Sequence, residues 1–169
     1  MTLYAITSFI RNRKEYFSLW YSEESEGFFT DGRKVLLFGT EEEASDYAGK
    51  ELKIKLNCNS KRYDLDNLEE ALSDHRFIPG NDNAAEYWAF FADYAASEGR
   101  SFGGDGKSFI LNDIYDKLFM QNVEAEGIFD EPDEPDESGF DLTDEEEDLT
   151  AAVLKSGIEI IDSSLGGRN

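Results

Sequence analysis

The order of its periodic segments is the feature that most limits the folds open to this 169-residue chain. Up to about residue 38 the pattern suits strands, because "LYAITSFI" is rich in strand-forming residues and "YFSLWYS" alternates between two faces. From residue 40 onward, most apolar residues recur at helical spacing. Strands followed by helices are typical of the α+β class. We therefore predict a small antiparallel sheet, formed by an N-terminal meander, with several helices packed on one of its faces.

Turn-forming residues separate the predicted strands. The polar "RNRKE" is expected to join the first two strands as a hairpin. Asp31–Gly32 marks a second tight turn, between "GFFT" and "KVLLFG". A further half-buried strand is predicted at residues 51–58, "ELKIKLNC". Its apolar side chains alternate with polar ones and are Leu52, Ile54, Leu56 and Cys58.

Two capping boxes mark the start of the first and last helices. Thr40 is followed three residues later by Glu43, and Thr143 in the same way by Glu146. Gly157 is predicted to end the last helix, and "IEIID" beyond it is expected to form a short strand. Three more helices are predicted between them, in "DLDNLEEALSDH", "NAAEYWAFFADYAASEG" and "NDIYDKLFMQ".

The net charge of −22 is concentrated towards the C-terminus. Residues 1–60 carry a net charge of −2, whereas residues 121–169 carry −14. The stretch "DEPDEPDESGFDLTDEEED", residues 130–148, holds twelve acidic residues and no Lys or Arg. We therefore predict three parts: an α+β core in residues 1–120, an acidic loop in 121–141, and a C-terminal helix with a short strand in 142–169 that packs on the core.

Several features predict a cytoplasmic protein. The N-terminus lacks the apolar core and cleavage site of a signal peptide. No run of about 18 apolar residues is present, so no membrane span is expected. The single cysteine, Cys58, cannot form an internal disulfide, which suits a reducing compartment.

Two motifs approach known binding sites, and each departs from its pattern. In "SFGGDGKS", Lys107 and Ser108 match the end of a phosphate-binding loop, but Ser101 stands where the first glycine belongs. A calcium loop aligned on Gly139 would begin with Glu134 instead of Asp, and the prolines before it exclude an incoming helix.

Catalytic chemistry has little support elsewhere. His75 is the only histidine, and no triad is visible around it or around Cys58. Cys58 lies on an apolar face, where a thiol usually acts as a small hydrophobe. Trp20 and Trp88 could anchor a partner, although Trp88 lies in a segment typical of a core. We predict no catalytic residue, no metal site and no cofactor.

The acidic stretch has two interpretations. Such runs are often solvated linkers. Yet a carboxylate surface also attracts basic proteins, while it repels nucleic acid and anionic membranes. Apolar residues within the stretch favour docking on a surface. The residues predicted to bind a partner are Asp130, Glu131, Asp133, Glu134, Asp136, Glu137, Phe140, Asp141 and Asp144.

The segments "GFFTDGRKVLLFGTEEEASDYA", "YDLDNLEEAL" and "EYWAFFADYAASEG", followed by "YDKLF", resemble small bacterial immunity proteins of contact-dependent growth inhibition and other polymorphic toxin systems. The resemblance covers roughly residues 27–120. It implies a cytosolic, acidic α+β domain that binds a cognate toxin, often a basic nuclease, and blocks it. Two alternatives stay open: a nucleic-acid mimic that inhibits a DNA-binding enzyme, and an enzyme that uses Lys107 or scattered carboxylates.

Overall fold

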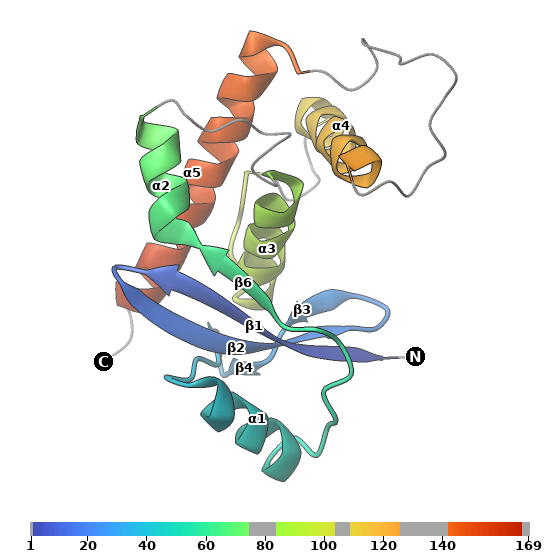
Figure 1. Ribbon diagram of the computed structural model, residues 1–169, viewed down its shortest axis with the longest axis vertical. Helices are drawn as coiled ribbons and strands as arrows, with labels where there is room; N and C mark the ends of the chain where they lie inside the picture. The colour runs from blue at the N-terminus through green and yellow to red at the C-terminus, as the bar shows by residue number, and fades with distance from the viewer. Residues whose placement is uncertain (1, 75–83, 104–108, 126–141, 167–169) are drawn as a thin grey trace.

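The computed structural model describes residues 2–74, 84–103, 109–125 and 142–166, and it confirms the α+β class (Figure 1). The strands are β1 (Leu3–Arg11), β2 (Lys14–Ser22), β3 (Glu26–Phe28), β4 (Thr30–Asp31), β5 (Lys34–Val35) and β6 (Lys61–Asp64). The helices are α1 (Glu41–Lys50), α2 (Leu65–Ser73), α3 (Ala84–Ser97), α4 (Phe109–Ala125) and α5 (Asp144–Gly166). One sheet has the strand order β3-β2-β1-β6, and a second pairs β4 with β5. Within the described ranges, no helix is long and apolar enough to span a membrane.

The hairpin predicted at the N-terminus is confirmed. β1 and β2 pair antiparallel, and Arg11 lies opposite Lys14 across a two-residue turn. The turn residues Asn12 and Arg13 have φ of 54° and 64°, as a type I′ turn requires. The Asp66 carboxylate stabilises this conformation, because it accepts a hydrogen bond of 2.8 Å from each of the two turn N–H groups.

The sheet is mixed, because β6 lies parallel to β1. The sequence pattern does not predict this strand: "KRYD" is short, and Tyr63 is its one apolar residue. The strand predicted at residues 51–58 is wrong. Lys53 adopts a φ of 54°, which interrupts strand geometry, and the N–H of Ile54 donates instead to the carbonyl of Ala48 in α1.

Helices cover both faces of the four-stranded sheet, so the prediction of a single covered face is wrong (Figure 1). α1 lies beneath the sheet, where Ala44 and Ala48 form a small cluster with Ile6 and Leu19. The opposite face is covered by α2, α3 and α5, which form the other layer. Successive side chains of a strand point to opposite faces, so the burial of both Ala5 and Ile6 is the mark of a sheet covered on both sides.

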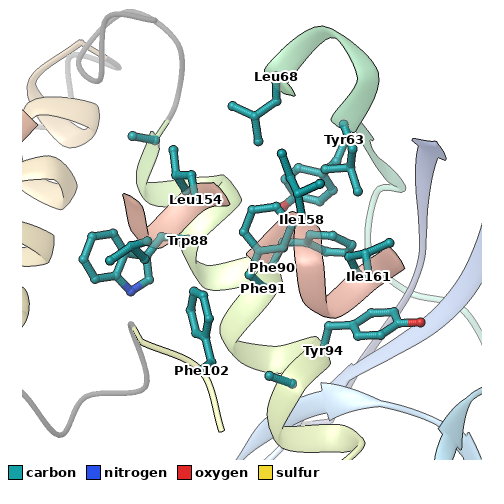
Figure 2. Packing of buried hydrophobic residues seen from close by; sticks show 14 of the residues in the cluster. Tyr63, Leu68, Trp88, Phe90, Phe91, Tyr94, Phe102, Leu154, Ile158 and Ile161 are labelled. Atoms are coloured by element: carbon teal, nitrogen blue, oxygen red, sulfur yellow. The ribbon is translucent and has the colours of Figure 1, made fainter. Parts of the chain in front are cut away.

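The larger core lies between α3, α5 and the sheet. Figure 2 shows Trp88 and Phe91 of α3 packed near Leu154 and Ile158 of α5. The core position predicted for Trp88 is confirmed, since its exposed fraction is 3%.

α5 continues through Gly157 to Gly166, so both the predicted helix end and the strand predicted at residues 158–162 are wrong. Gly157 allows α3 and α5 to pack closely, and it does not end the helix. A Cβ atom at this position would lie 2.2 Å from the ring of Phe91, so α3 and α5 can approach this closely only with glycine here.

Both predicted threonine N-caps are present, and the capping box is complete at α5 only. The hydroxyl of Thr40 accepts a 3.1 Å hydrogen bond from the N–H of Glu43, and Thr143 accepts one of the same length from Glu146. At α5 the return bond is also made, from the N–H of Thr143 to the Glu146 carboxylate at 3.1 Å. At α1 the Glu43 carboxylate accepts from Gly39 instead, at 3.3 Å. At each helix start, the N–H of the third helical residue is therefore satisfied by the threonine side chain.

Candidate functional site

The predicted partner-binding residues fall almost entirely outside the described part of the chain. Asp144 is described, and it is the first residue of α5. The rest of the set lies in residues 126–141 and stays a prediction: Asp130, Glu131, Asp133, Glu134, Asp136, Glu137, Phe140 and Asp141. His75, Lys107 and most of the possible calcium loop also lie outside the described residues.

The first turns of α5 carry the acidic run onto a helix whose position is defined. Four carboxylates there are exposed, and among the described residues they form no ion pair: Asp144, Glu145, Glu147 and Asp148. The helix N-terminus stabilises negative charge, so these side chains support α5 while they face solvent.

Glu146 has a different role from its neighbours. Its carboxylate accepts hydrogen bonds from the Lys117 ammonium at 2.9 and 3.0 Å, which ties α5 to α4. The bond from Lys117, together with the N–H of Thr143, holds the pKa of Glu146 below its usual value. Glu146 thus orients the acidic helix start, and the carboxylates around it remain exposed.

A second candidate site is a pocket of about 430 Å³ between the sheet and α3. This volume lies within the range of small-molecule sites, roughly 300–1,000 Å³. The space exists because Ala5 and Thr7 on β1 and Ala89 on α3 have short side chains. Exposed residues at its mouth are Glu26, Asn59 and Lys61, and buried residues at its floor include Phe28, Tyr63 and Phe90.

Asp93 is the polar centre of this pocket. The indole Nε1–H of Trp20 donates to its Oδ2 at 3.2 Å. Burial raises the pKa of Asp93 to about 6, and the Glu26 carboxylate adds to this effect. The Trp20 hydrogen bond and the Lys61 ammonium act in the opposite direction. In the described part of the chain Asp93 has no ion-pair partner.

Tyr63 shares the same environment on the floor of the pocket. Burial is the main cause that raises the pKa of its hydroxyl above the ordinary value, and the carboxylates of Glu86 and Asp93 add to it. The phenol therefore stays protonated at neutral pH and keeps both its donor and its acceptor capacity.

No pattern in the sequence predicts this pocket. The available signal is a single carboxylate, Asp93, within the apolar run "YWAFFADYAA" of α3. Helical periodicity cannot show that β1, β3 and β6 bring Thr7, Glu26 and Lys61 to the same place, because these residues are far apart in the chain.

Cys58 is half-buried and lines the same pocket. The described residues contain no group of three or more His, Cys, Asp or Glu side chains that could hold a metal ion. In comparisons with known proteins, no family model, curated protein or solved structure matches the chain. Function must therefore be inferred from the acidic helix start and from the pocket.

Proposed function

We propose that this chain is an immunity protein that acts in the cytoplasm, where it binds and neutralises a cognate toxin domain, a basic nuclease. The observation that supports this most is the uncompensated acidic run of residues 130–148, whose last five residues occupy the start of α5. Four of those five are exposed and have no cationic partner among the described residues.

Charge complementarity identifies the kind of partner. A nuclease holds its substrate with Lys and Arg side chains that replace counterions. A protein with a net charge of −14 in residues 121–169 is attracted to such a surface and repelled by the nucleic acid itself. The binding of this chain to the toxin would cover the surface that the substrate needs.

The start of α5 is also a suitable place for the contact. The Thr143 cap and the Glu146–Lys117 ion pair hold the helix end in one geometry before binding, which lowers the entropic cost of association. Exposed apolar side chains on α4 and α5 can supply contacts that become buried when the toxin binds. They are Leu149 on α5, and Ile110 and Phe119 on α4, with exposed fractions of 40%, 65% and 49%.

The direct test is a growth experiment with the toxin domain encoded beside the gene of this chain. Expression of that domain alone should stop growth, and co-expression of this chain should restore it. A neighbouring gene that encodes no toxin, or growth that this chain does not restore, would contradict the proposal. Inhibition of unrelated DNA-binding proteins in competition with duplex DNA would favour the nucleic-acid mimic instead.

The role of the acidic helix start can be tested separately with two matched double variants. Asp144→Asn with Glu145→Gln removes two carboxylates at the first two positions of α5. Glu41→Gln with Glu42→Gln removes two at the equivalent positions of α1, after an equivalent Thr cap. Both variants change the net charge equally, but only the first alters the proposed contact.

Association with the purified toxin domain would be followed by stopped flow at several salt concentrations. Because electrostatic steering acts on the on-rate, the α5 variant should associate roughly two- to tenfold more slowly at low salt, and the α1 variant much less so. High salt should remove the difference. Equal on-rates for the two variants would exclude the start of α5 as the contact surface.

A further inference from the structure

The pocket between the sheet and α3 has a composition that points to one class of ligand. Its charged side chains are two carboxylates, Glu26 and Asp93, and one ammonium, that of Lys61. Asp93 accepts a single side-chain hydrogen bond, from Trp20 to Oδ2, and the described residues give its Oδ1 no donor. A carboxylate in such a position can accept further hydrogen bonds from a bound cation.

The aromatic walls of the pocket also favour a cationic ligand. Four aromatic rings line it and belong to Trp20, Phe28, Tyr63 and Phe90. Aromatic faces attract ammonium groups and also bury apolar surface. An anion would meet the two carboxylates, and a purely apolar ligand would desolvate the Oδ1 of Asp93 without giving it a hydrogen-bond donor.

We propose that this pocket binds a small organic cation, an ammonium group carried on an apolar body, with Asp93 as its counterion. The apolar body would lie against the rings of Tyr63 and Phe90, and the ammonium would reach Asp93 beside the Trp20 indole. A free small molecule fits better than a protein segment, because the volume of about 430 Å³ is typical of small-molecule sites. The pocket is built from β1, β2, β3, β6 and α3 and does not include the acidic start of α5, so the site is separate from the proposed toxin contact.

The test uses three probes of nearly equal shape: 2-phenylethylamine, which is a cation, 2-phenylethanol, which is neutral, and 3-phenylpropionate, which is an anion. The readout is the NMR signal of the Trp20 indole N–H, which donates directly to Asp93. Trp88 is the other tryptophan and gives an internal reference, because it does not line the pocket. Only the amine should move the Trp20 signal, with saturation and a Kd of about 1 mM or tighter.

Three variants make the test specific. Asp93→Asn keeps the shape and removes the charge, and it should weaken amine binding at least about tenfold. Ala89→Leu should fill the pocket and abolish binding, and because Ala89 is only half-buried the fold should tolerate it. Asp46→Asn is the control, since it removes an exposed carboxylate from α1 on the opposite face of the sheet and should bind as the unmodified protein does.

A second readout needs no variant. Cys58 is the single cysteine of the chain and lines the pocket, so a bound amine should slow its reaction with a thiol reagent while the neutral and anionic probes should not. The proposal is overturned if the alcohol or the carboxylate binds as well as the amine, if Asp93→Asn binds the amine unchanged, or if no probe moves the Trp20 signal.

Discussion

Two acid-rich regions of this protein use their carboxylates in opposite ways. At the end of β1, the buried guanidinium of Arg11 is surrounded by the carboxylates of Asp66, Glu69 and Asp162. Asp162 binds it in a bidentate manner, with Nε–Oδ1 and Nη2–Oδ2 distances of 2.7 and 2.8 Å. At the start of α5, four of the five successive carboxylates from Asp144 to Asp148 face solvent, and the fifth, Glu146, is the one that is paired with a described cation.

The difference shows that a count of acidic residues does not measure the charge available to a partner. The Arg11 cluster joins three elements, β1, α2 and α5, and contributes to folding. The pairs with Asp162 and Glu69 raise the pKa of Arg11 above its ordinary value, so its positive charge is permanent. Among the described residues, the other four carboxylates at the start of α5 have no such partner, so their field extends into the solvent.

The largest effect is expected when Arg11 is removed. Arg11→Met should destabilise the protein by about 2–4 kcal/mol, because it leaves three carboxylates close together without their common cation. The free energy of unfolding in urea measures this cost. Arg62→Met is the control, since Arg62 is an exposed residue paired with Glu15 and should cost less than about 1 kcal/mol. If both variants lose the same free energy of unfolding, the carboxylates around Arg11 stabilise the fold no more than an exposed ion pair does.

A smaller effect is expected at Gly157, which lies between the two regions on α5. Gly157→Ala should destabilise the protein by about 1–3 kcal/mol, because its Cβ would overlap the buried ring of Phe91 and push α5 away from α3. Gly49→Ala in α1 is the matched control, because a Cβ there meets no atom within 4 Å, and alanine is the better helix former by about 1 kcal/mol. Thermal unfolding should show opposite shifts of Tm. A stable Gly157→Ala variant would mean that α5 is not held as closely as described.

The smallest effect concerns Asp93, a carboxylate that is neither paired with a cation nor freely exposed. Its pKa is raised from 3.8 to about 6 in the folded protein. Between these two pH values the folded state holds a proton that the unfolded state releases, so stability falls as the pH rises from about 4 to 6 and stays lower above it. Two charged residues also act on the Asp93 carboxyl: Glu26 raises its pKa and Lys61 lowers it, so both shift the pH range of this loss of stability.

Asp93→Asn should remove that loss of stability. It keeps an acceptor for the Trp20 indole, and it should be more stable than the unmodified protein by about 1–2 kcal/mol at pH 7, with little difference at pH 4. Unfolding free energies at the two pH values test this. A constant difference across the range would show that Asp93 does not titrate as a buried group. Higher stability together with lost amine binding would separate the roles of Asp93 in folding and in recognition.

Local patterns predicted much of this fold, and the errors have identifiable causes. The Thr40 and Thr143 caps and the first hairpin depend on residues close in the sequence, and all three are confirmed. Local sequence predicts a helix end at Gly157 because glycine is common at such ends, whereas the role of this glycine depends on Phe91, which is distant in the chain. Residues 51–58 alternate as a strand does, but Leu52, Ile54 and Leu56 pack beneath the sheet without pairing in it.

The succession of strands and helices, the caps and the concentration of acidic residues in the last third can all be predicted from the order of residues, because each depends on composition or on residues a few positions apart. Which carboxylates are neutralised, and where a pocket opens, depends instead on how distant segments pack in the folded chain. Arg11 meets Asp66 and Asp162 across 55 and 151 residues of chain, and Asp93 meets Trp20 across 73. Coulombic attraction and desolvation depend on distance through space and on burial, and neither quantity can be read from the order of residues alone.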